Sequence, residues 1–264
     1  MSRVIPGICM AAGWFLLLLY GPFALFWGVT LLGAVLALHE FFRMTLGMRW
    51  GWRQAVTIGC CLGPVLTSFW GHGDAVLAGM MFSLLALAAL ALHGYGSMDD
   101  SLRYAGYAGF SCIYISGCMA HMVLLRAHPQ GSFWLIMLVA IVAGSDTGAY
   151  YAGRAFGKRK LFPLLSPKKT VAGGVGGMVA GVVAAEGINL LFPHPVNPGT
   201  LLLVALVLVV VGIAGDLTES MIKRSVDCKD SGAILFGHGG LLDRLDSLLL
   251  TAPVLYYLLR FGVV

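Results

Sequence analysis

Long apolar segments recur from one end of the chain to the other, with only short polar stretches between them. Hydrophobic residues make up 59% of the 264 residues, charged residues make up 11%, and the mean hydropathy is +0.87. A helix needs about 20 apolar residues to cross the hydrocarbon core of a bilayer. The pattern therefore predicts an all-α polytopic integral membrane protein with about nine transmembrane helices. We expect them over residues 5–20, 22–39, 54–70, 74–93, 104–125, 132–152, 171–191, 199–216 and 241–259.

The lysines and arginines are distributed unevenly over this arrangement. Fifteen of the seventeen basic residues fall on the side that carries the N terminus. Because cytoplasmic loops carry an excess of basic residues, this predicts a cytoplasmic N terminus and places residues 216–246 on the cytoplasmic side. We attribute the net charge of +5 to topology and to anionic partners such as membrane lipids, and not to nucleic acid.

Residues 215–247 concentrate charge between two apolar segments. They hold ten ionic side chains of both signs. The helical spacing i, i+3, i+4 and i+7 places four polar residues on one face, namely Asp216, Glu219, Ser220 and Lys223. Further along, Asp243 and Asp246 repeat the i, i+3 spacing.

A glycine turn lies between these two acidic groups, at Gly237-His238-Gly239-Gly240. Backbone without Cβ atoms can approach a phosphate closely. Carboxylates, cations and such a turn are what a metal-dependent phosphoryl or nucleotidyl transfer needs, and hard oxygen ligands suit Mg²⁺.

Asp146 is a second candidate, because it lies inside an apolar helix, where a carboxylate is costly. A structural bond between two helices is the alternative explanation. The loop that follows holds six cations, namely Arg154, Lys158, Arg159, Lys160, Lys168 and Lys169. They would attract a triphosphate or a lipid phosphate. Their charges also fit the excess of basic residues that marks a cytoplasmic loop. Glu40, at the end of the second expected helix, is interpreted as a paired or snorkelling charge at the membrane interface.

Residues 220–246 resemble the signature of the phosphatidate cytidylyltransferase (CDP-diacylglycerol synthase) family. The residues that stand at the family's spacing are Ser220, Lys223-Arg224, Lys229-Asp230, Gly232, His238-Gly239-Gly240, Asp243-Arg244 and Asp246. Two further stretches are similar to the family, residues 145–150 and the pentad of residues 166–170. Two positions depart from it: Phe236 replaces a usual proline, and Val171-Ala172-Gly173 stands where the family commonly has Trp-Glu-Gly.

The resemblance implies that CTP and phosphatidate react to CDP-diacylglycerol and pyrophosphate. It implies Mg²⁺ held by Asp216 and Asp243, and we also consider a second cation such as K⁺. The expected catalytic residues are Asp216, Lys223, Asp243, Asp246 and His238. The expected substrate-binding residues are Asp146, Arg154, Ser166, Lys168, Lys169, Thr170, Ser220, Arg224, Lys229, Asp230, Gly239, Gly240 and Arg244.

We expect one membrane-embedded domain over residues 1–264, with N-terminal helices in 1–130 and the catalytic part in 131–264. The expected location is a bacterial inner membrane with the site facing the cytoplasm, and glycine-rich helices allow a homodimer. Two other function classes are considered. A CTP-dependent polyprenol-type lipid kinase would release CDP in place of pyrophosphate. A transporter would distribute ionisable residues through the membrane depth, whereas here they gather at one face.

Overall fold

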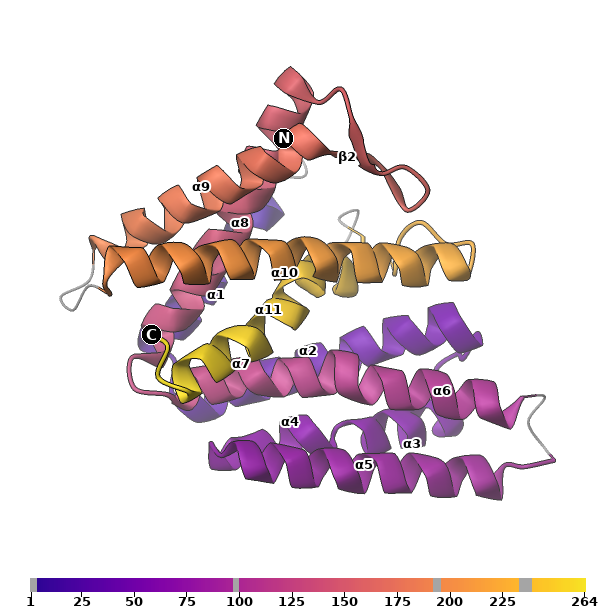
Figure 1. Cartoon of the computed structure of the whole chain (residues 1–264). Helices are drawn as coiled ribbons and strands as arrows, with labels where there is room; N and C mark the ends of the chain where they lie inside the picture. The colour runs from indigo at the N-terminus through magenta and orange to yellow at the C-terminus, as the bar shows by residue number, and fades with distance from the viewer. Residues whose placement is uncertain (1–3, 97–99, 192–195, 233–238) are drawn as a thin grey trace. The chain divides into compact units, whose positions relative to one another are not determined.

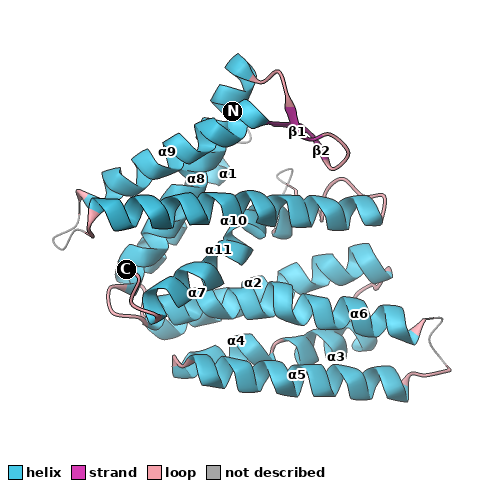
Figure 2. Ribbon diagram, viewed as in Figure 1, coloured by secondary structure: helices cyan, strands magenta, loops and turns pink. Residues whose placement is uncertain are grey.

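Helices dominate the structure, a computed structural model that describes residues 4–96, 100–191, 196–232 and 239–264 (Figures 1 and 2). This confirms the all-α prediction. Within the described residues, six helices are long and apolar enough to cross a membrane, namely Phe23–Leu46, Gly73–His93, Ser101–Ala127, Gly131–Phe156, Val171–Asn189 and Pro198–Ser225. The count of about nine membrane helices stays a prediction.

The chain forms two compact units. The first comprises residues 1–129 together with 230–244, and the second comprises residues 130–229 together with 245–264. The polar segment predicted to carry chemistry is therefore divided, because residues 230–232 and 239–244 belong to the unit of the N-terminal helices.

The first unit is a set of helices around a core of large apolar side chains, including Phe26, Phe41, Phe42 and Leu38. Its elements are α1 (Val4–Tyr20), α2 (Phe23–Leu46), α3 (Trp52–Cys61), α4 (Gly63–Thr67), η1 (Ser68–Trp70), α5 (Gly73–His93), α6 (Ser101–Ser111), the π-helical η2 (Cys112–Gly117) and α7 (Cys118–Ala127). Since α6, η2 and α7 follow one another without a break, they form a single long helix over Ser101–Ala127.

The helix expected over residues 54–70 is divided into α3, α4 and η1. The first break falls at Leu62, just before Gly63-Pro64. Proline lacks a backbone N–H and its ring clashes with the preceding turn, so it is tolerated at the start of a helix and not in its interior. The proline therefore begins a new helix here.

The second unit contains α8 (Gly131–Phe156), α9 (Val171–Asn189), α10 (Pro198–Ser225) and most of α11 (Leu242–Arg260). Helices α8 and α9 run side by side along their length (Figure 1). Small residues make this possible: a Cβ added to Gly148 would lie 2.6 Å from the carbonyl oxygen of Gly176, and one added to Gly144 would lie 2.8 Å from Ala184 Cβ. These glycines serve contacts within the chain, and a homodimer stays a prediction.

Two short strands connect α8 to α9. β1 (Lys160–Phe162) and β2 (Ser166–Thr170) pair antiparallel, with Lys160 opposite Thr170 and Phe162 opposite Ser166 (Figure 2). Thr170 then caps α9, because its hydroxyl accepts a hydrogen bond from Gly173 N at 3.0 Å. The hairpin thus carries the lysines of β2 to the start of α9.

Candidate active site

A cavity of about 220 Å³ in the second unit brings several predicted residues together. Three of the elements that line it contribute charged residues, α8 with Asp146, β2 with Lys168 and Lys169, and α10 with Asp216. Ser145, Tyr150 and Thr170 complete its polar wall. The cavity therefore combines carboxylates from two helices with two ammonium groups from the hairpin.

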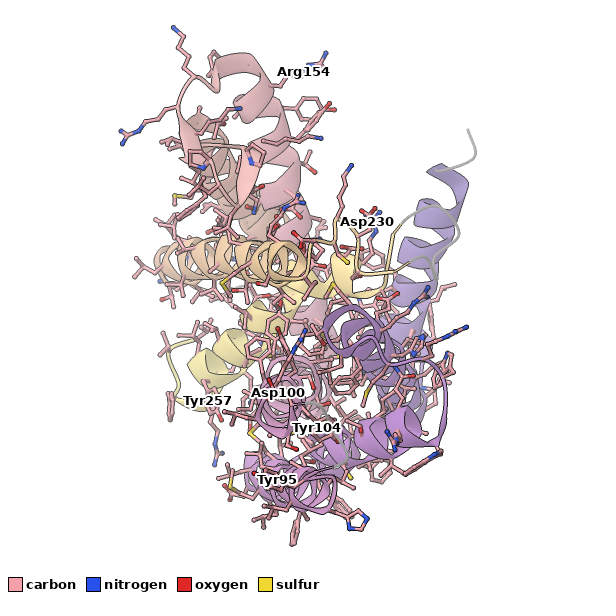
Figure 3. The ribbon with its side chains drawn as sticks, turned by 90° about the vertical axis from the view of Figure 1, so that its right-hand side faces the viewer. Tyr95, Asp100, Tyr104, Arg154, Asp230 and Tyr257 are labelled. Atoms are coloured by element: carbon pink, nitrogen blue, oxygen red, sulfur yellow. The ribbon has the colours of Figure 1, made fainter. Side chains whose placement is uncertain are left out.

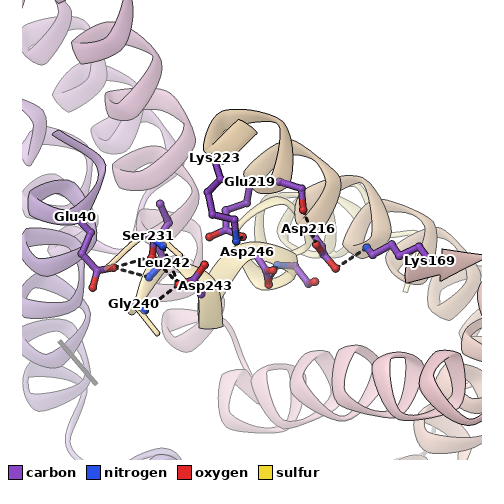
Figure 4. Close-up of polar contacts among 12 residues, drawn as sticks. Glu40, Lys169, Asp216, Glu219, Lys223, Ser231, Gly240, Leu242, Asp243 and Asp246 are labelled. Atoms are coloured by element: carbon purple, nitrogen blue, oxygen red, sulfur yellow. Dashed lines mark hydrogen bonds and ion pairs between the residues drawn. The ribbon is translucent and has the colours of Figure 1, made fainter. Parts of the chain in front are cut away.

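Asp216 contacts one residue of β2 and one residue of its own helix, α10. Its Oδ2 lies 2.5 Å from Lys169 Nζ, and its Oδ1 lies 3.4 Å from the Ser220 hydroxyl one helical turn later (Figure 4). The two side chains of the ion pair are 24% and 29% exposed. Asp216 is thus held by one cation that faces the cavity and by one hydroxyl on its own helix.

Two further carboxylates in this unit repel Asp216. Asp146 interacts electrostatically with Asp216 and with Lys169. Asp246, on α11, interacts with Asp216, Asp146 and Lys223. α10 and α11 approach closely here, because a Cβ on Gly215 would lie 2.5 Å from the carbonyl oxygen of Asp246. Three carboxylates on three helices of this unit therefore interact with one another and with the cations Lys169 and Lys223.

Asp146 makes no hydrogen bond or ion pair within the described part of the chain. This weighs against the alternative that it serves as a structural bond between helices. Its position on the cavity wall favours a role in the site.

The helical spacing predicted for residues 216–223 is confirmed by α10, which continues to Ser225. Lys223 Nζ lies 2.7 Å from Glu219 Oε2 on the next turn. Glu219 is buried, with 1% of its surface exposed, whereas Lys223 is partly exposed. Glu219 therefore holds the Lys223 ammonium in place along the polar face of the helix.

Asp243 lies in the first unit at the start of α11, and one of its oxygens organises the preceding turn. Oδ2 accepts hydrogen bonds from Ser231 N at 3.0 Å, Ser231 Oγ at 3.0 Å and Gly240 N at 2.8 Å (Figure 4). Gly239 adopts a φ of 83°, which favours glycine. A metal-binding role of Asp243 stays a prediction.

Glu40 is the residue whose partners the sequence interpretation did not identify. It is buried, with 1% exposed, so its carboxylate does not snorkel to the surface. Its carboxylate accepts hydrogen bonds from Leu241 N and Leu242 N, each at 3.0 Å, and from Ser231 Oγ at 3.3 Å. A sequence signal existed, since Glu40 is an acidic residue at the end of a long apolar run, but nothing local identified its partners.

The sequence model of the cytidylyltransferase family matches residues 1–262 of the chain. The phosphatidate cytidylyltransferase of Staphylococcus haemolyticus is 33% identical over 253 residues, which are 92% of this chain and 95% of that one. The chain belongs to the cytidylyltransferase family. The phosphatidate cytidylyltransferase of Bacillus subtilis is 44% identical over 155 residues, so that alignment spans 58% of each chain, less than two thirds. These matches confirm the resemblance inferred from residues 220–246.

The remaining residues expected to act in the reaction lie outside the cavity. Arg154 and Asp230, labelled in Figure 3, are exposed, as are Arg224, Lys229 and Arg244. Salt bridges to Asp227 or Asp230 are the structural alternative for these basic residues, and within the described residues neither Arg224 nor Lys229 forms one. Ser166 begins β2. His238 and Phe236 lie outside the described residues.

The described residues contain no group of three or more His, Cys, Asp or Glu side chains arranged to hold a metal ion. Mg²⁺ in phosphate-binding enzymes commonly uses one or two carboxylates and takes its other ligands from water and substrate phosphates. Asp216 and Asp146 on one cavity therefore suffice as a donor set of that kind.

Proposed function

We propose that the chain transfers the cytidylyl group of CTP to phosphatidate in a Mg²⁺-dependent reaction at the cytoplasmic membrane face. The products are CDP-diacylglycerol and pyrophosphate. The observation that carries this proposal is the cavity in which Asp146, Asp216, Lys168 and Lys169 converge, in a chain whose relatives are named phosphatidate cytidylyltransferases.

The two lysines of β2 bind the triphosphate. Lys168 is exposed, and Lys169 is partly exposed and paired with Asp216, so both are accessible from the cavity. An ammonium group is a compact charge with three donors, which suits phosphate oxygens that change position during transfer. The hairpin supports this role because it attaches both lysines to the first turn of α9.

Asp216 holds Mg²⁺, with Asp146 and Asp246 as neighbouring carboxylates and Asp243 as the second predicted ligand. The repulsion among the carboxylates of the second unit supports this assignment. When bound, Mg²⁺ would neutralise charge on the triphosphate and stabilise the leaving pyrophosphate. A second cation such as K⁺ stays a prediction.

In the proposed step a phosphatidate oxygen attacks the α-phosphorus of CTP. A bond forms between them, and the bond from the α-phosphorus to the bridging oxygen of pyrophosphate breaks. No residue needs to act as a general base, because a phosphate monoester with a second pKa of about 6 is largely ionised at neutral pH. Lys223 stabilises charge on the reacting phosphates, and Glu219 holds its ammonium group ready for that contact. His238 donates a hydrogen bond to a phosphate oxygen.

The cytoplasmic orientation in a bacterial inner membrane follows from the skew of basic residues. A single cysteine introduced at Lys160, in a variant otherwise free of cysteine, should react with an impermeant thiol reagent only from the cytoplasmic side. One at Asn197 should react only from the outside. The reverse labelling pattern would overturn this orientation.

The activity is tested with protein purified in detergent and incubated with labelled CTP, phosphatidate and Mg²⁺. We expect a CDP-lipid and pyrophosphate, strong loss in Asp216→Asn, and full activity in Asp74→Asn, which changes an exposed carboxylate in the first turn of α5. Release of CDP with a phosphorylated lipid would instead indicate a kinase. Folded protein that converts neither CTP with phosphatidate nor CTP with a polyprenol-type lipid would exclude the enzyme hypothesis.

A further inference from the structure

Glu40 of α2 bonds to a part of the chain that is remote in sequence. Among the described residues its hydrogen-bond partners lie 191 to 202 residues further on, at Ser231, Leu241 and Leu242. Two of these contacts are to backbone N–H groups at the start of α11. The first N–H groups of a helix have no partner within the helix, and the positive end of the helix dipole favours a carboxylate there. Glu40 thus fixes where α11 begins.

The same carboxylate explains two glycines of the polar segment. A Cβ on Gly232 would lie 2.5 Å from Glu40 Oε1, and a Cβ on Gly240 would lie 2.5 Å from Glu40 Oε2. Any side chain at either position would displace Glu40. These glycines therefore admit the carboxylate between the two ends of the segment, which is a different purpose from close approach to a phosphate.

Ser231 links Glu40 to Asp243. Its buried hydroxyl lies 3.3 Å from Glu40 Oε2 and 3.0 Å from Asp243 Oδ2, so it can donate to either carboxylate. Asp243 in turn bonds the Gly240 N–H. Ser231 therefore joins Glu40 to Asp243, and the two carboxylates accept hydrogen bonds from the backbone N–H groups of residues 240–242 (Figure 4).

We propose that Glu40 is a positioning residue for cytidylyl transfer. It sets the geometry of Ser231 and of residues 240–243 without touching a substrate, and so places Asp243 for the reaction. The proposal rests on the function proposed above. Small misplacements of reacting groups lower the rate steeply. Loosening of residues 240–243 should therefore lower kcat in protein that is still folded.

The first test is Glu40→Gln, which keeps the side-chain size but replaces one acceptor oxygen by an NH₂ group. That group would face the N–H and O–H donors that now bond to the carboxylate. We expect kcat to fall at least about tenfold, with a smaller change in KM. The matched control is Thr30→Val, which alters another buried polar residue of α2 whose hydroxyl bonds locally to Phe26 O. It should keep wild-type kcat. An unchanged kcat in Glu40→Gln would overturn the proposal.

A second test keeps the proposal falsifiable if Glu40→Gln folds poorly. Gly232→Ala should lower kcat because its Cβ displaces Glu40, and the shorter side chain of Glu40→Asp in the same chain should restore part of that loss. The fraction of wild-type kcat that the double variant retains should therefore exceed the product of the fractions that the two single variants retain. Purely multiplicative losses would show that Gly232 and Glu40 do not act together.

A third readout does not depend on activity. Lys229 is exposed and lies two residues before Ser231, so trypsin can report how firmly Ser231 and its neighbours are held. Cleavage after Lys229 should be faster in Glu40→Gln than in wild type and in Thr30→Val. If wild-type protein lacks transferase activity but this difference persists, the proposed function fails while the positioning contact stands. Equal cleavage rates would refute the contact.

Discussion

Lys169 pairs with Asp216 in the structure and binds the triphosphate in the proposed reaction. Its replacement by methionine removes both contacts, and their effects can be measured separately. In the structure its ammonium lies 2.5 Å from Asp216 Oδ2. A divalent cation bound by Asp216 has to displace or share that contact. Lys169→Met removes the competition and also removes one cation from the triphosphate. Metal affinity and CTP affinity should therefore change in opposite directions.

The magnitudes follow from the exposure of the pair. Both side chains are about a quarter exposed, so the ion pair contributes at most about 1 kcal/mol, equivalent to about fivefold in a dissociation constant. The concentration of Mg²⁺ needed for half-saturation should fall by up to that factor. A charged hydrogen bond to phosphate contributes about 1.5–3 kcal/mol, so KM for CTP should rise about ten- to hundredfold.

Two assays measure the two effects. The rise in thermal midpoint with Mg²⁺ concentration, without nucleotide, reports metal binding, and initial rates at fixed free Mg²⁺ give KM for CTP. Lys168→Met is the matched control, because Lys168 lines the same cavity but makes no ion pair within the described residues. It should raise KM and leave the Mg²⁺ midpoint unchanged. A Mg²⁺ midpoint in Lys169→Met equal to or above that of wild type would refute the argument.

Three further outcomes are expected. Asp216→Asn and Asp243→Asn should each abolish most activity and raise the Mg²⁺ requirement, and the double variant should lose little more, because ligands of one ion act as a unit; multiplicative losses would assign the two residues to separate sites. Gly148→Ala should lower the free energy of unfolding by about 1–3 kcal/mol through overpacking against α9, whereas Gly187→Ala, which has open space around its Cβ, should not; equal thermal midpoints would contradict the packing argument. Thr170→Ala should cost about 1 kcal/mol of stability through loss of the α9 cap and Thr170→Ser should retain it, as measured by thermal unfolding; a loss shared by both variants would point to the threonine methyl group.

The sequence alone determined the features that depend on neighbours within one or two helical turns. Apolar segments of sufficient length indicated membrane helices, and the spacing of residues 216, 219, 220 and 223 indicated one polar helix face. Both are confirmed in α10, where Ser220 contacts Asp216 and Lys223 contacts Glu219. Such contacts follow from the helix period and need no knowledge of the rest of the fold.

Resemblance to a family added what periodicity does not contain. It supported Asp146, Lys168 and Lys169, which their charges had already made candidates, and the structure places all three on one cavity with Asp216. The resemblance does not explain why these residues lie on one cavity. Their proximity depends on the close packing of α8 and α9. That packing follows from which small residues of the two helices face each other, and each helix alone has several such candidates.

Only the tertiary structure decided the role of Glu40. The sequence places this carboxylate at the end of a hydrophobic helix, where an interfacial charge is the ordinary explanation. Its burial against Leu241, Leu242 and Ser231 depends on a segment about 200 residues away packing with the N-terminal helices. Local patterns specify helices, whereas the pairing of distant segments is set by how their side chains and glycines fit together, and that fit is a property of the folded chain.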